Sequence, residues 1–128
     1  MEIHIIKNSS VYYTMGASIA VGFSMNIDNV YAYNVKFFGD IPVNFGGIVA
    51  GHSWMSYIND SFAYKIFIND VETTNLIGEW GYTANNIYYG NTDFVYSENF
   101  YLTTLKWSNQ VWEFSSLNPI DNKLAFFK

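Results

Sequence analysis

The chain has 128 residues, the usual size of one domain, and we predict a single β domain over residues 1–128. Half of its residues are hydrophobic and 20% are aromatic, but only 13% are charged, against about 25% in an average soluble domain. The net charge is −5, and all six basic residues are lysines that stand singly. Without arginine or a basic run, the chain is not predicted to bind nucleic acid.

Most segments have the composition of β-strands, because Val, Ile, Tyr, Phe, Trp and Thr dominate and helix-forming residues are sparse. Turn residues close each segment at short intervals. The predicted strands other than those at 30–40 and 62–70 are EIHIIK, VYYTM, ASIAVGFSMNI, FGGIVAGHSW, GEWGY, NIYYG, DFVYSENFYLTTLKW, QVWEF and KLAFF. No stretch has the roughly 18 apolar residues of a membrane-spanning helix, so no transmembrane segment is expected.

Two segments alternate with the period of two that a strand requires. In VYAYNVKFFGD the alternation places Tyr31, Tyr33, Val35 and Phe37 on one face.

In FAYKIFIND the alternation places one set of side chains on one face of the strand and a second set on the other face. Asn69-Asp70 then turns the chain into VETTNLIG, which predicts a hairpin. The first set is Phe62, Tyr64, Ile66 and Ile68, and the second is Ala63, Lys65 and Phe67. Many short strands with frequent turns predict an all-β fold, and we expect an antiparallel β-sandwich of the jelly-roll kind.

Trp54, Trp80 and Trp107 stand at nearly equal intervals, which raises the question of an internal repeat. No glycine or turn recurs in phase with them. Even spacing by chance in an aromatic chain therefore accounts for the tryptophans better than a repeat does.

The stretch IVAGHSWM resembles the Gly-x-Ser-x-Gly nucleophile elbow of esterases and lipases around Ser53. Met55 stands where the elbow needs its second glycine, and no histidine follows Ser53 to act as the base. A serine without a base is a weak nucleophile. The chain is therefore predicted not to be an enzyme, and a serine hydrolase ranks third among the hypotheses.

Metal and cofactor sites are not expected either. The chain has no cysteine, and its two histidines, His4 and His52, form no ligand motif. Its aspartates occur beside turn residues, where capping of backbone N–H groups accounts for them better than a calcium ion does, because the spacing of a calcium loop is absent. The glycine-rich phosphate motifs are missing as well. We predict no cofactor and no metal.

The surplus of Trp and Tyr is the most informative feature, because a small core cannot hold all of them. Exposed aromatic rings beside amides form the usual binding site for a sugar. The segments Glu79–Asn86 and Trp107–Trp112 are the richest in both, and packing in the core or across an interface is the alternative interpretation. The candidate ligand-binding residues are Trp80, Tyr82, Asn85, Asn86, Trp107, Asn109 and Trp112, and the candidate interface residues are Trp54 and Tyr57.

The leading hypothesis is a non-enzymatic structural or interaction protein that assembles through aromatic, charge-poor β surfaces. Its partners would be copies of itself or other protein subunits, in a virion, a tail or an extracellular assembly. The alternative is a carbohydrate-binding module or lectin, with a glycan as partner.

Overall fold

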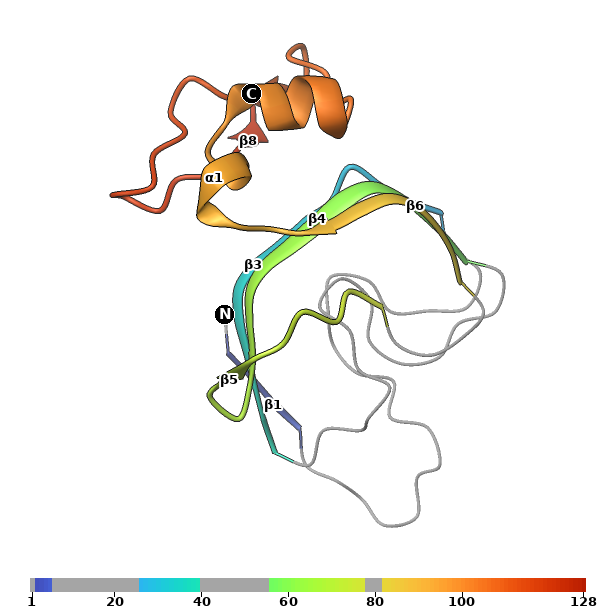
Figure 1. Cartoon of the computed structure of the whole chain (residues 1–128), viewed down its shortest axis with the longest axis vertical. Helices are drawn as coiled ribbons and strands as arrows, with labels where there is room; N and C mark the ends of the chain where they lie inside the picture. The colour runs from blue at the N-terminus through green and yellow to red at the C-terminus, as the bar shows by residue number, and fades with distance from the viewer. Residues whose placement is uncertain (1, 6–25, 40–55, 78–81) are drawn as a thin grey trace. The chain divides into compact units, whose positions relative to one another are not determined.

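The computed structural model describes residues 2–5, 26–39, 56–77 and 82–128. The chain divides into two compact units, Met1–Tyr89 and Gly90–Lys128 (Figure 1). Strands predominate and helices are few, which confirms the all-β class; the single domain stays a prediction. Among the described residues, no helix combines the length and apolarity needed to cross a membrane.

The first unit is built around one six-stranded sheet. Its strands are β1 (Glu2–Ile5), β2 (Asn26–Asp28), β3 (Tyr31–Gly39), β4 (Ser56–Ile68), β5 (Val71–Glu72) and β6 (Tyr82–Tyr89). β1 pairs with β3, β2 and β3 pair with β4, and β6 pairs with β4. All four of these pairings are parallel, and β3, β4 and β6 run side by side as curved ribbons in Figure 1.

The antiparallel pairing predicted for the sheet is therefore wrong for these strands. Alternation along a strand reports which face each side chain occupies, and it carries no information about the direction of the neighbouring strand. Residues 40–55 separate β3 from β4, and a parallel return needs about a dozen or more residues. The sandwich arrangement stays a prediction.

The strands stack in a constant register. Asn26 pairs with Tyr57 and Phe37 pairs with Ile68, so one offset holds along all of β2 and β3. A second constant offset relates β4 to β6, as in the pair of Ser56 with Tyr82. We call β2 with β3, β4, and β6 the three rungs of the stack.

Each rung bends at the same place. Asn29, Asp60 and Asn86 have positive φ angles of 55°, 48° and 60°, and the register on either side places them in one column across the rungs. Asn and Asp tolerate this left-handed conformation better than other residues with a Cβ. With these residue types at the bends, the three rungs bend together with little backbone strain.

A second bend reverses the alternation of side chains. Asn34 and Lys65 also have positive φ, and they occupy equivalent positions on β3 and β4. Ala32 is buried before the bend of β3, and Val35 and Phe37 are buried after it. The prediction that Tyr31, Tyr33, Val35 and Phe37 share one face of the strand is therefore wrong.

The same correction applies to β4. Ala63 and Ile66 belong to one buried cluster on either side of Lys65, although the sequence prediction placed them on opposite faces. A strict period of two fails wherever a residue in the left-handed conformation interrupts the pleat.

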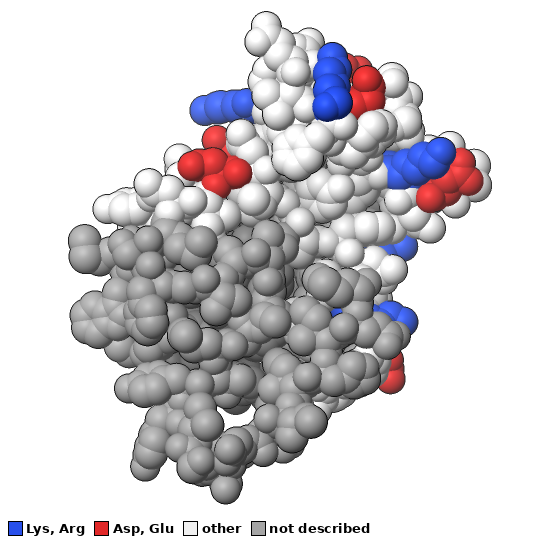
Figure 2. Space-filling model, turned by 180° about the vertical axis from the view of Figure 1, so that it is seen from behind, with Lys and Arg blue, Asp and Glu red and all other residues white. Residues whose placement is uncertain are grey.

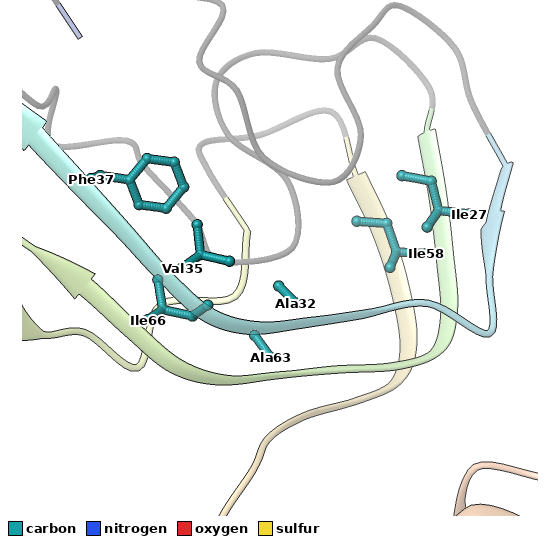
Figure 3. Close-up of a cluster of buried hydrophobic side chains, with 7 residues drawn as sticks. All are labelled: Ile27, Ala32, Val35, Phe37, Ile58, Ala63 and Ile66. Atoms are coloured by element: carbon teal, nitrogen blue, oxygen red, sulfur yellow. The ribbon is translucent and has the colours of Figure 1, made fainter. Parts of the chain in front are cut away.

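The buried cluster of the first unit covers one face of the bent sheet (Figure 3). It consists of Ile27, Ala32, Val35, Phe37, Ile58, Ala63 and Ile66. Tyr89 packs against it from β6, and its hydroxyl accepts a hydrogen bond from Ile66 N (3.2 Å) and donates one to Glu72 Oε1 (2.6 Å). Burial, and then the bond to Glu72, raise the pKa of Tyr89 far above its usual value.

The predicted hairpin at Asn69-Asp70 is confirmed. Ile68 pairs with Val71 in antiparallel register, and both turn residues have positive φ, 47° and 65°. Two successive residues of this kind are the signature of a type I′ turn, whose twist matches that of the flanking strands.

The second unit corrects the strand predicted at DFVYSENFYLTTLKW. It contains α1 (Thr92–Val95), the π-helix η1 (Phe100–Thr104), and the two short antiparallel strands β7 (Trp112–Glu113) and β8 (Phe126–Phe127). Asn91 begins α1, because its Oδ1 accepts hydrogen bonds from Asp93 N (2.9 Å) and Phe94 N (3.2 Å). This cap and the tertiary packing of the aromatic residues override their strand propensity.

The aromatic side chains of the second unit form its core. Tyr101 is fully buried, its ring lies 5.3 Å from that of Trp107, and its hydroxyl donates to Val95 O (2.6 Å). Trp107 stacks on Trp112 at 4.3 Å between ring centroids. The aromatic surplus is therefore used in part for burial, which was the alternative weighed in the sequence.

Replacing Ile58 by alanine should destabilise the first unit by about 2–5 kcal/mol, because the side chain is fully buried at the middle rung. Urea unfolding measures this loss. The matched control is Val71→Ala, at an exposed position, which should change the free energy of unfolding by less than about 0.5 kcal/mol. Equal unfolding midpoints for the two variants would contradict the described core.

Candidate functional site

The three rungs present a polar surface on the side opposite the buried cluster. In β2 the exposed Asn26 and Asp28 flank the buried Ile27. The register aligns Asn26 with Tyr57 and Thr83, and it aligns Asp28 with Asn59 and Asn85. We call these six residues the outward polar face: Asn26, Tyr57, Thr83, Asp28, Asn59 and Asn85. Side chains on neighbouring rungs lie about 4.8 Å apart, and those two residues apart on a rung lie about 6.7 Å apart.

Tyr57 is the aromatic member of the outward polar face. It is 48% exposed, and it lies in register between Asn26 and Thr83. A half-exposed tyrosine on a regular strand offers a rigid apolar ring with a hydroxyl at its tip.

Amide and carboxylate side chains form hydrogen bonds from rung to rung. We call the two adjacent columns of such residues the Asx ladder: Asp28, Asn59 and Asn85 in one column, and Asn29, Asp60 and Asn86 in the other. Asn59 Nδ2 donates to Asp28 Oδ1 (2.9 Å), and Asn86 Nδ2 donates to Asp60 Oδ1 (2.6 Å). Each bond joins an amide to the carboxylate of the preceding rung, which fixes the register of the rungs.

Further hydrogen bonds hold the bends in place. Tyr88 donates its hydroxyl to Asn86 Oδ1 (2.7 Å). Ser61, which is fully buried, accepts from Val30 N (3.2 Å) and donates to Asn59 O (2.7 Å). A buried hydroxyl with both a donor and an acceptor partner costs little on folding.

Aromatic rings stack beyond the first bend of β3 and β4. Tyr31 lies over Phe62 at 5.2 Å, and Tyr33 lies over Tyr64 at 5.8 Å. Burial raises the pKa of Tyr31. Lys65 Nζ lies 5.8 Å from the Tyr33 ring and 5.6 Å from the Tyr64 ring, distances at which a cation is attracted to ring faces.

The structure brings two of the predicted site residues together in the first unit. Tyr57, predicted at an interface, and Asn85, predicted to bind a ligand, both belong to the outward polar face. Asn86, the next residue, belongs to the Asx ladder. Tyr82 begins β6, and its side chain is outside what the structure describes.

The other candidates are placed differently. Trp54 and Trp80 lie outside the described residues, as does Ser53 of the elbow-like stretch. Trp107 and Trp112 are 2% and 6% exposed in the second unit, where each ring is stacked on a neighbour. Asn109 is exposed in that same unit. Burial leaves the two tryptophans little ring surface for stacking on a sugar.

Sequence reasoning missed the Asx ladder, although a signal was present. The strings Ile27-Asp28-Asn29, Ile58-Asn59-Asp60 and Ala84-Asn85-Asn86 each place an apolar residue before two Asx residues. Their spacing equals the two register offsets of the sheet. The repeat lies in the residues that make the bends, and the nearly equal spacing of the three tryptophans does not match its two unequal offsets.

The outward polar face is suited to neutral hydrogen bonding, because hydroxyl and amide groups supply most of its donors and acceptors. Among the described residues, no three His, Cys, Asp or Glu side chains are grouped as metal ligands. Comparison of the chain with protein-family models, with curated proteins and with solved structures finds no match.

The variant Asp60→Ala tests the Asx ladder. Alanine in the left-handed conformation costs about 1–2 kcal/mol, and losing the partner of the Asn86 amide adds about 1 kcal/mol. We expect a total loss of about 2–3 kcal/mol in urea unfolding.

The control is Asp60→Asn, which tolerates the bend and keeps an oxygen acceptor, so its loss should stay within about 1 kcal/mol. If the alanine variant is as stable as the asparagine variant, the bend does not depend on this residue.

Proposed function

We propose that the chain is a non-enzymatic structural or interaction protein that assembles through charge-poor β surfaces with exposed aromatic and apolar side chains. The observation that supports this proposal best is a group of exposed apolar side chains close together at the β7–β8 pair of the second unit. We call this group the C-terminal patch: Val111, Phe126 and Phe127 are 49%, 48% and 68% exposed, and Phe126 and Phe127, as neighbours on β8, offer apolar surface on both of its faces.

The C-terminal patch is held by regular structure. Phe127 pairs with Trp112 across β7 and β8, and their rings stack at 4.4 Å between centroids. Lys128 N donates to Val111 O (2.9 Å), which ties the residue before β7 to the end of β8. Exposed aromatic side chains on a rigid support lose little conformational entropy when a partner covers them.

The distribution of charge also favours assembly. On the face shown in Figure 2, lysines and acidic residues of the described chain stand singly or in small mixed groups, with uncharged surface between them. The cores of protein interfaces are depleted in charge and enriched in aromatic residues. The partners we propose are further copies of the chain or other protein subunits, in a virion, a tail or an extracellular assembly.

For the first unit we propose a β-solenoid in place of the sandwich predicted from the sequence. The proposal is supported by the parallel pairing, by the constant offsets and by bends that recur in register. Solenoids stack one repeat on the next and present extended regular surfaces to partners.

Light scattering after size-exclusion chromatography tests assembly through the C-terminal patch. The wild-type chain should show a mass above the 14.7 kDa of one copy at micromolar concentration, and Phe126→Ser should lower that mass. Ile120→Ser is the matched control, because Ile120 is also exposed but lies outside the patch, and it should keep the wild-type mass. A strictly monomeric wild type that binds no partner would refute the proposal.

The second candidate is a carbohydrate-binding module, supported by the outward polar face. Tyr57 offers an exposed ring there, with Asn59 and Asn85 two positions further along adjacent rungs. A ring that stacks on the apolar face of a sugar, beside amides that bind its hydroxyls, is the arrangement of such sites.

Glycan-array binding measures this second candidate. If it is correct, the wild-type chain binds a subset of glycans, and Tyr57→Ala abolishes that binding while the unfolding midpoint stays within a few degrees, since Tyr57 is half-exposed. Val71→Ala, at an exposed position on β5, should bind as the wild type does. Binding that survives Tyr57→Ala would exclude the outward polar face as the sugar site.

A further inference from the structure

The outer edge of β6 is exposed at its beginning. Among the described strands, β6 pairs with β4 alone, and Thr83, Ala84 and Asn85 are all exposed. Neighbouring residues of a strand point to opposite faces of the sheet. Exposure of three in a row therefore means that the described part of the chain leaves this stretch open on both faces.

Ala84 marks the end of the stack that the described rungs form. It continues the column of Ile27 and Ile58, which are 5% and 0% exposed in the buried cluster. Ala84 faces the same side of the sheet but is exposed. A further strand beside β6 would cover Ala84 in the way that the neighbouring rungs cover Ile58.

β6 also lacks the features that keep an edge strand from pairing. Its sequence, YTANNIYY, contains no charged residue and no proline. Charged side chains and prolines are the usual means by which proteins block exposed sheet edges. An uncharged edge with a small residue in its middle is a template for another strand.

We propose that β6 pairs with β6 of a second copy, in antiparallel orientation about a two-fold axis near Ala84. This inference rests on the proposed assembly function and names one surface that would carry it. A two-fold axis needs a self-complementary surface, and here Thr83 of one copy would face Asn85 of the other. Both side chains donate and accept hydrogen bonds.

The net charge of the chain favours this segment as the meeting point of two copies. Each copy carries a net charge of −5, so most surfaces bring like charges together when the molecules associate. Thr83, Ala84 and Asn85 place no charge at the contact. Three paired residues bury less surface than a standard interface of about 1,600 Å², so we expect a reversible dimer whose population rises with concentration.

Disulfide trapping tests the pairing, because the chain contains no cysteine of its own. Directly opposed residues of an antiparallel pair have Cα atoms about 4.5–5.5 Å apart, which is within the range that a disulfide bridges. Oxidation of Ala84→Cys should give a covalent dimer with twice the monomer mass. Val71→Cys, also exposed and on a strand, is the matched control and should give at most a trace of dimer.

A second variant gives a non-covalent readout. Asn85→Lys places like charges across the proposed axis, so the mass measured by light scattering should fall below that of the wild type at the same concentration while the unfolding midpoint is kept. If the wild type oligomerises but Ala84→Cys gives no more dimer than Val71→Cys, the β6 pairing is wrong and the assembly function stands. A wild type that is monomeric at every concentration refutes the β6 pairing, and it refutes the assembly function only if it also binds no other subunit. An open-ended series of oligomers that persists in Phe126→Ser refutes the two-fold pairing, because a two-fold contact closes on itself.

Discussion

The structure of the first unit depends on residues that adopt the left-handed conformation at the same position of successive rungs. Asn29, Asp60 and Asn86 bend three parallel strands together. Bonds from Asn59 to Asp28 and from Asn86 to Asp60 then hold one rung to the next. Without the bends, a parallel sheet of this size would be nearly straight along its strands, and the residues of the buried cluster would not converge on one concave face.

The same geometry creates both the polar surface and the open edge. Because the rungs are in register, residues of similar polarity meet in the columns before the first bend, so polar residues collect on the outward polar face while aliphatic residues collect in the core. The column of Ile27 and Ile58 ends at the exposed Ala84. A stack of strands buries each rung against its neighbours, so its last rung is where a partner can add.

The sequence predicted the strand content, the hairpin at Asn69-Asp70 and the burial alternative for the tryptophans of the second unit. It did not predict parallel pairing, because strand direction depends on long-range connections. It also misplaced Val35 and Ile66, since a bend by one left-handed residue shifts the alternation and leaves no mark on hydrophobicity. The helical turns of the second unit escaped detection because aromatic residues favour strands unless tertiary packing and a cap such as Asn91 prevail.

Residue type alone marked Tyr57 and Asn85 as candidate site residues. That they lie close together follows from the register of β4 and β6, which the repeated Asx pairs encode. That register is the central claim, and intramolecular disulfide formation in two double-cysteine variants measures it. Tyr57 and Thr83 are paired on one face, so Tyr57→Cys with Thr83→Cys should form a disulfide within one chain. Tyr57→Cys with Ala84→Cys should not, because a shift of one residue points the side chains to opposite faces. The reverse outcome would contradict the stacked register.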